Sequence, residues 1–180
     1  SVPMSEEELK PLLPPDVSIA IINEPACIVS GPPESVDAVE KQMRERRLMC
    51  IGLKADFAPH SASMDKAVTL FRERLNRVNF KPPAIPPVSC LTGRTVQPEE
   101  IAGPGYWVRH LTDTVRFSAG IREILKGKPP VFVEIGPGRN LTVLVNRYIQ
   151  EFKSNAEPGA LIPMAIDPVP GELKKESGME

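Results

Sequence analysis

Residues 17–31 read VSIAIINEPACIVSG, two apolar runs separated by a polar turn. Branched apolar side chains dominate residues 17–22 and 26–30, as is typical of β-strands. The intervening Asn23-Glu24-Pro25 is turn chemistry, because asparagine tolerates turn conformations and proline interrupts a strand ladder. The stretch therefore predicts a tight antiparallel hairpin.

Helical patterns flank this hairpin on both sides. Residues 5–8 form a capping box, which starts a short helix, and residues 33–47 carry an apolar stripe at helical spacing. That stripe consists of Val36, Val39 and Met43. Residues 48–53 are apolar enough for a third strand. The order helix, strand, strand, helix, strand predicts a ferredoxin-like small subdomain that lacks most of its first strand, with residues 1–4 as its stump.

The chain beyond residue 54 has the pattern of an α/β fold. Apolar residues at helical spacing predict an amphipathic helix after His60, a second one after Phe117, and a third that follows a glycine turn at residues 136–138. The first of these stripes consists of Met64, Ala67, Val68, Phe71, Leu75 and Val78. Residues 88–91 predict a strand. Residues 131–135 are apolar on both faces apart from Glu134, which is the pattern of a strand inside a parallel sheet covered by helices.

Composition and charge exclude several classes of function. The 180 residues carry a formal net charge of −1 with both signs interspersed, so we expect no nucleic-acid partner. No apolar run approaches the roughly 20 residues that cross a bilayer, and the first residues lack the features of a signal peptide. The sequence therefore predicts a cytoplasmic protein without a membrane partner.

The cysteines and histidines do not have the spacing of a metal site. Cys27, Cys50 and Cys90 are far apart, and each lies in an apolar, strand-like run. Structural metal sites draw on close-set ligands, and neither His60 nor His110 has one nearby in the sequence. We expect three reduced cysteines, no metal and no bound cofactor.

Residues 56–65, DFAPHSASMD, contain the better-placed histidine. Pro59 favours an extended conformation before it, and Ser61, Ser63 and Asp65 favour a helix start after it. His60 is therefore expected where a strand stops and a helix begins, a position that suits a general base in a cleft. A solvated loop histidine is the alternative that this local pattern leaves open.

Four motifs together resemble the acyltransferase domain of modular polyketide synthases, the malonyl-CoA:acyl carrier protein transacylase family. They are Asn23-Glu24-Pro25 with Ser30-Gly31-Pro32, Pro59-His60-Ser61, Tyr106-Trp107-Val108-Arg109-His110, and Glu134-Ile135-Gly136-Pro137. The resemblance covers about residues 5–150 and corresponds to the second half of such a domain. It implies a small subdomain at residues 1–54, the end of an α/β-hydrolase-like large subdomain at residues 55–152, and a linker at residues 153–180.

The resemblance implies a two-step acyl transfer. A serine takes a malonyl-type group from acyl-CoA and passes it to the phosphopantetheine thiol of an acyl carrier protein. His60 matches the catalytic histidine that activates this serine. The same alignment assigns the orientation of His60 to the backbone carbonyl of His110, whose side chain is expected only to pack.

The nucleophile of this reaction does not appear in the sequence. No serine stands in a Gly-x-Ser-x-Gly elbow, the strand-to-helix turn that carries the family's nucleophile. The resemblance therefore implies a partner, namely the first half of the acyltransferase with the serine, the oxyanion hole and a carboxylate-binding arginine. Adjacent synthase domains are further expected partners.

Residues Phe57, Ala58 and Pro59 occupy the position of the family's extender-unit motif. Family members with His-Ala-Phe-His there usually select malonyl units, and those with Tyr-Ala-Ser-His usually select methylmalonyl units. Pro59 is compact and leaves space where phenylalanine would fill it. These three residues are therefore the expected substrate contacts, and an α-substituted malonyl unit is the expected substrate.

Two other classes of function stay open at this point. The exposed Arg44, Arg46 and Arg47 suit a non-catalytic module that docks a carrier protein, although a charged helix face is usually just solvated. A serine-histidine hydrolase or editing enzyme would use the same base with water as acceptor, because a fold does not determine a reaction class.

Overall fold

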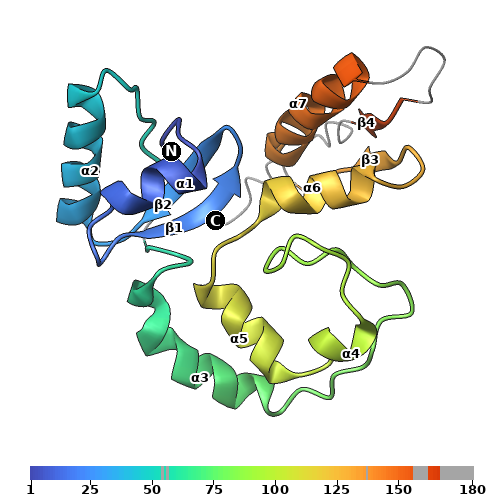
Figure 1. The fold of residues 1–180 in the computed structure, drawn as a ribbon. Helices are drawn as coiled ribbons and strands as arrows, with labels where there is room; N and C mark the ends of the chain where they lie inside the picture. Colours follow the sequence, from blue (N-terminus) through green and yellow to red (C-terminus); the bar gives the residue numbers. More distant parts are fainter. Residues whose placement is uncertain (54, 56, 137, 156–161, 167–180) are drawn as a thin grey trace, which may run out of the picture. The chain divides into compact units, whose positions relative to one another are not determined.

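A computed structural model describes residues 1–53, 55, 57–136, 138–155 and 162–166 (Figure 1). The chain divides into two compact units, residues 1–123 and residues 124–180. These units are groups of residues that contact one another and are not subdomains defined by function. The subdomain boundaries expected at residues 54 and 152 therefore stay a prediction.

The predicted hairpin is present in the first unit. Strand β1 (Ser18–Asn23) pairs antiparallel with β2 (Ala26–Ser30). Across the turn, the backbone N–H of Glu24 donates to the hydroxyl of Ser118 at 2.7 Å. That hydroxyl donates in turn to the carbonyl of Ile22 at 3.0 Å, so one side chain of a later helix secures the turn.

Residues 1–2 lie beside the hairpin and pair with it in the manner of a strand. Val2 forms an antiparallel bridge with Cys27 of β2. On the other side, Ser1 and Ile51 exchange hydrogen bonds, from the terminal amine to the carbonyl at 2.6 Å and from Ile51 N–H to the Ser1 carbonyl at 3.0 Å. The prediction of a strand at residues 48–53 was wrong. Ser1 is a single partner residue, and it cannot supply the ladder of hydrogen bonds that a regular strand needs.

Two helices cover this small sheet and close the core. Helix α1 (Glu6–Leu9) begins with the predicted capping box at Ser5 and continues as a 3₁₀ turn, η1 (Lys10–Leu12). Helix α2 (Pro33–Glu45) buries Val39 and Met43, as its stripe predicted. The buried core cluster consists of Val2, Leu9, Val17, Ile19, Ile22, Cys27, Val39 and Met43.

Helices and the loops that join them make up the rest of the first unit (Figure 1). The 3₁₀ turn η2 (Ala62–Met64) leads into α3 (Asp65–Leu75), where Val68, Phe71 and Leu75 of the apolar stripe are half-buried and Ala67 is exposed. Helices α4 (Pro98–Ile101), α5 (Pro104–Thr112) and α6 (Phe117–Leu125) follow. Helix α5 contacts both α3 and α4. The sequence predicted α6, but it did not predict that residues 104–112 are helical.

Residues 88–95 form a tight turn in place of the predicted strand at residues 88–91. Only Val88 and Thr95 pair, as an isolated antiparallel bridge. Gly93 has φ +66°, a left-handed conformation that a side chain would strain. A Cβ at Gly93 would also stand 2.4 Å from the Cβ of Ala119, so glycine is required there for two reasons.

The segment after α5 runs alongside β1. Ile21 and Val115 form a parallel bridge, in which Val115 N–H donates to the Ala20 carbonyl and Ile22 N–H donates to the Val115 carbonyl, both at 2.8 Å. The Thr114 hydroxyl adds a hydrogen bond of 2.7 Å to the Ile19 carbonyl. These contacts place the residue before Thr114 at a defined position beside the hairpin.

The second unit contains a strand-turn-helix arrangement. Strand β3 (Val131–Val133) pairs in parallel with β4 (Met164–Ile166), and its other edge has no partner among the described residues. Helix α7 (Asn140–Asn155) follows a turn in which Gly136 and Gly138 have φ +149° and +92°. The linker predicted at residues 153–180 lies largely outside the described residues. Its described part contains β4, a three-residue strand that is too short to show periodicity in the sequence.

Glu134 occupies the N-terminus of α7. Its carboxylate accepts hydrogen bonds from the backbone N–H groups of Leu141 at 3.2 Å and Thr142 at 2.8 Å. The Thr142 hydroxyl adds a third at 2.6 Å, and these bonds hold the pKa of Glu134 below its usual value. A carboxylate from the chain itself therefore accepts from two of the backbone donors at the start of α7.

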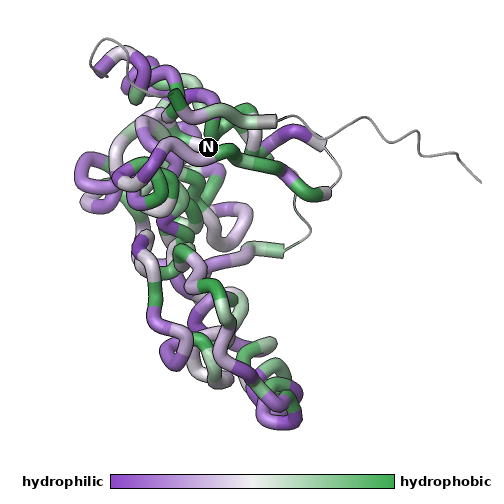
Figure 2. The backbone as a smooth tube through the Cα atoms, turned by 90° about the vertical axis from the view of Figure 1, so that its right-hand side faces the viewer, coloured by the Kyte–Doolittle hydropathy of each residue, from purple (hydrophilic) through white to green (hydrophobic). Residues whose placement is uncertain are grey.

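Hydrophilic and hydrophobic stretches are interspersed along the backbone (Figure 2). Within the part of the chain that the structure describes, no helix has the length and hydrophobicity to span a membrane.

Candidate active site

His60 lies in the loop before η2 with a backbone conformation unusual for its residue type. Its φ is +55°, in the left-handed region that few residues other than glycine adopt. The backbone N–H of His60 donates to the Leu111 carbonyl at 3.3 Å, which helps to hold this conformation. Strained conformations of this kind are concentrated at functional sites.

The loop around His60 is fixed by the buried Ser61. Its hydroxyl donates to the Ala58 carbonyl at 2.8 Å and accepts from the Ser63 N–H at 3.2 Å, which caps η2. The sequence signal for a helix start after His60 is therefore confirmed, although a 3₁₀ turn precedes the α-helix.

The imidazole of His60 is oriented by Asp113 rather than by His110. Its Nδ1 atom lies 3.1 Å from the backbone carbonyl oxygen of Asp113. The prediction that the backbone carbonyl of His110 orients this ring was therefore wrong. The error has a structural cause: residues 104–112 form α5, where the carbonyl of His110 belongs to the last helical turn. Asp113 is the C-cap of α5 with ψ 157°, and it is the first residue beyond the helix.

The ring of His110 packs instead against two aromatic neighbours. The centroids of Tyr106 and Trp107 lie 6.0 and 6.1 Å from that of His110. Tyr106 is itself anchored, because its hydroxyl lies 2.8 Å from that of the buried Ser89. The expectation that the His110 side chain packs is confirmed.

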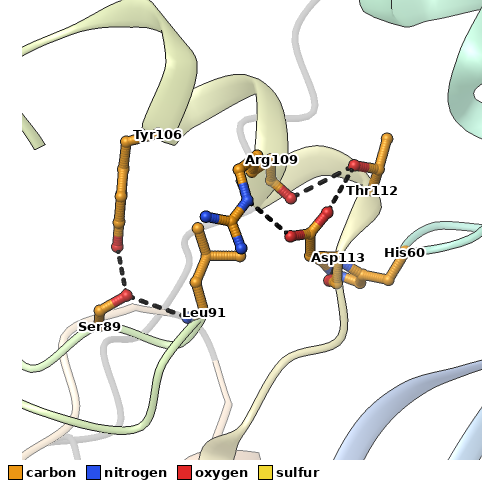
Figure 3. A network of polar contacts seen from close by, with 7 residues as sticks. All are labelled: His60, Ser89, Leu91, Tyr106, Arg109, Thr112 and Asp113. Carbon is orange, nitrogen blue, oxygen red and sulfur yellow. Dashed lines mark hydrogen bonds and ion pairs between the residues drawn. The ribbon is translucent and has the colours of Figure 1, made fainter.

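Asp113 is held on both oxygens of its carboxylate. Arg109 Nε donates to Oδ2 at 2.9 Å and the Thr112 hydroxyl donates to Oδ1 at 3.0 Å. Figure 3 shows the two side chains meeting this carboxylate, with His60 beside Asp113. The sequence offered no signal for Asp113 as an orienting residue, because the backbone carbonyl that His60 uses is common to every residue type.

The electrostatic environment keeps His60 neutral. Partial burial lowers the pKa of its imidazole below the ordinary value of 6.5, and the nearby His110 lowers it further. The hydrogen bond to Asp113 opposes this shift without overcoming it. Because a carbonyl oxygen can only accept, Nδ1 carries the proton in the neutral ring. Nε2 is then left with a free lone pair, which is the requirement for a general base.

A pocket of about 680 Å³ lies beside this loop within the first unit. Phe57, Ala58 and Pro59, the expected substrate contacts, all line it. The lining also includes Ile21 and Val29 of the hairpin together with Val36 of α2. The three residues are therefore placed at an apolar pocket whose lining does not include His60 itself, and their contact with a substrate stays a prediction.

No cluster of three or more histidine, cysteine, aspartate or glutamate side chains that could hold a metal ion occurs within the described ranges. Cys27 is buried, and its burial raises the pKa of the thiol to about 11. Burial also raises the pKa values of Cys50 and Cys90, so none of the three thiols is activated as a nucleophile.

Comparison with known proteins identifies the family of this chain. A family model described as an acyl transferase domain matches residues 1–177. This chain belongs to that family. A phenolphthiocerol/phthiocerol polyketide synthase protein of Mycobacterium tuberculosis (strain H37Rv) is 29% identical over 79% of this acyl transferase chain and 10% of its own length. The spectinabilin polyketide synthase system protein NorB of Streptomyces orinoci is 32% identical over 92% of the chain and 8% of its own length.

Solved acyl transferase domains share its fold. The domain of ZmaA is 38% identical with a TM-score of 0.74, over 81% of this chain and 34% of that one. The domain of SpnD, solved in complex with 2-(pent-4-yn-1-yl)malonyl, is 31% identical with a TM-score of 0.80. The match covers 92% of this chain and 38% of the SpnD chain. The expected α/β fold is confirmed. The chain spans about a tenth of the length of these curated relatives and just over a third of these solved domains.

Proposed function

We propose that this chain supplies the general base and part of the acyl pocket of a polyketide synthase acyltransferase. The enzyme moves a malonyl-type group from acyl-CoA, through a serine ester, to the phosphopantetheine thiol of an acyl carrier protein. The observation that carries the proposal is the neutral His60 with Nδ1 bonded to the Asp113 carbonyl, which leaves Nε2 free to accept a proton.

The chemistry proceeds in two balanced halves. His60 Nε2 accepts the serine hydroxyl proton as the oxygen attacks the thioester carbonyl, and the C–S bond then breaks while the imidazolium returns the proton to the departing coenzyme A thiol. In the second half His60 takes the proton from the carrier thiol, whose sulfur attacks the serine ester. The serine oxygen leaves and recovers the proton from His60.

The serine must come from a segment other than residues 1–180. None of the serines in this sequence has the glycine context of an elbow. The oxyanion donors and the arginine that pairs with the malonyl carboxylate are assigned to that same segment.

The acyl group that fits the proposal best is an α-substituted malonyl unit. Pro59 lines the pocket at the extender-unit position, and its compact ring leaves space for a branch. The related SpnD domain was solved with a malonyl group that carries a pentynyl substituent. That observation supports the proposal that a pocket in this fold accommodates a substituent on the α-carbon of the malonyl group.

The test is acylation by an enzyme assembled from this chain and the serine-bearing segment of an acyltransferase. Replacing His60 by alanine should slow acyl-enzyme formation by a factor on the order of 10² or more, as the loss of a general base does. His110→Gln is the matched control, because it changes the other histidine of the chain, and it should cause a much smaller loss. Equal rates for His60→Ala and the parent enzyme would overturn the proposal.

The same experiment separates transfer from hydrolysis. The acyl group should appear on the carrier protein, as measured by mass spectrometry of the phosphopantetheine arm. Release of free acid with no carrier acylation would show that water is the acceptor and would favour the editing function.

A further inference from the structure

The carboxylate of Asp113 is held from two sides by residues of its own helix end. We propose that Arg109 and Thr112 are positioning residues, which hold Asp113 so that its backbone carbonyl keeps His60 in the tautomer a general base needs. The inference rests on the proposed function of His60, and it concerns residues to which that function assigns no role.

Arg109 is linked to Asp113 through both its backbone and its side chain. Its carbonyl accepts from the Asp113 N–H at 2.8 Å, and its Nε donates to Oδ2 at 2.9 Å. The Thr112 hydroxyl closes the arrangement on Oδ1 at 3.0 Å (Figure 3). The aspartate is therefore restrained about its side-chain torsions as well as at its N–H.

The carbonyl that these contacts restrain lies where the chain leaves α5. The last carbonyls of a helix have no partner within it, so their direction depends on whatever holds the chain beyond. On the far side of Asp113, Thr114 and Val115 are bonded to β1. On the near side, Arg109 and Thr112 provide the equivalent anchor. The carbonyl between them is thus held from both directions and meets His60 Nδ1 at 3.1 Å.

The tautomer of His60 depends on that carbonyl. A neutral imidazole carries its proton on one nitrogen, and the partner of the other nitrogen decides which one. A carbonyl at Nδ1 selects Nδ1–H and leaves Nε2 as the base. If the carbonyl turns away, this preference is lost. In a fraction of the enzyme molecules the imidazole of His60 then carries its proton on Nε2, and that nitrogen cannot accept the serine proton. The loss then falls on kcat and leaves acyl-CoA binding unchanged.

The ion pair itself contributes little to folding, which makes the test possible. The Arg109 and Asp113 side chains are 65% and 36% exposed, and exposed pairs of this kind stabilise a protein only slightly. We therefore expect variants of Arg109 to fold.

The first measurement is the tautomer of His60 by long-range ¹H–¹⁵N NMR on histidine-labelled protein. The chain has only two histidines, so two sets of ring signals are expected. Above the pKa of His60, the parent should show Nδ1–H. Arg109→Met combined with Thr112→Val should shift His60 towards Nε2–H. Thr112→Val alone is isosteric and should shift it part of the way, while Thr112→Ser keeps the hydroxyl and should restore the parent spectrum.

Arg94→Met is the matched control. Arg94 pairs with Glu100 at 2.9 Å, with side chains 54% and 39% exposed, so the change removes a similar ion pair at a different place. It should leave the His60 tautomer as in the parent.

The second measurement is acylation by the assembled enzyme. The double variant should lower kcat on the order of three- to tenfold with an unchanged KM for acyl-CoA, since small misplacements of a catalytic group are costly. An unchanged Nδ1–H signal in both the double variant and Thr112→Val would overturn the inference. A shifted tautomer, together with full activity of His60→Ala, would instead support the positioning role and overturn the proposed function.

Discussion

The Nδ1 atom of His60 lies 3.1 Å from the backbone carbonyl oxygen of Asp113, 53 residues further along the chain. A neutral carbonyl orients the ring as a carboxylate would, but it supplies no full negative charge to stabilise the imidazolium. Burial can therefore keep the pKa of His60 low, so the proposed base is neutral at neutral pH.

The pH dependence of acyl-enzyme formation should reflect this low pKa. Only neutral His60 can accept the serine proton, so the rate should hold as the pH falls to 6.5, the ordinary histidine value, and decline below it. Rapid-quench measurements of kcat/KM for acyl-CoA over the range from about pH 5 to 8 would locate the pH at which the rate declines. An apparent pKa above 6.5 would contradict this assignment.

Replacing Pro59 by phenylalanine should shift the acyl preference towards malonyl. The larger side chain would fill the space beside Phe57 and Ala58 in the pocket, at the expense of a branched substrate. A methyl group in an apolar pocket is worth about 1 to 3 kcal/mol of discrimination, which sets the size of the change. Competition between malonyl-CoA and methylmalonyl-CoA measures it. An unaltered ratio would show that other pocket residues control the choice.

Replacing Gly93 by alanine should destabilise the first unit by about 1–3 kcal/mol, the range for overpacking and strained backbone. The added Cβ would meet the Cβ of Ala119 at 2.4 Å, and φ is +66°. Gly105→Ala is the control, because nothing lies within 4 Å of a Cβ at that position in α5. Urea unfolding of the two variants compares their free energies. Equal midpoints would show that the 88–95 turn adapts at no cost.

Glu134→Gln should weaken the start of α7 at neutral pH but not in acid. The carboxylate has its pKa lowered in the folded protein by its bonds to Thr142 and Leu141. Its contribution is therefore present above the unfolded value, near 4.5, and is lost as the pH falls through the lower folded value. Hydrogen exchange of the Leu141 and Thr142 amides at about pH 7 and about pH 3 would follow the loss.

Glu73→Gln is the control for that experiment. It removes an exposed carboxylate in the last turn of α3, far along the chain from α7. If both variants changed the α7 amides equally, the capping role of Glu134 would be refuted.

Local sequence signals determined a large part of this structure. The turn at residues 23–25 predicted the hairpin, the capping box at Ser5 predicted α1, and the apolar stripes predicted α2 and α6. Each signal involves residues within a few positions of one another, so backbone preference and side-chain spacing are enough. The same local chemistry placed His60 just before a helix start, and four motifs along the chain together indicated the family.

Tertiary structure alone decided how His60 is oriented. A backbone carbonyl has the same chemistry in every residue, so the sequence could not distinguish Asp113 from His110, and the choice depended on where α5 ends and on the pairing of Val115 with β1. Tertiary structure also decided that residues 48–53 form no strand. A strand exists only where a partner supplies its hydrogen bonds, and among the described residues Ser1 alone pairs with that segment in the manner of a strand.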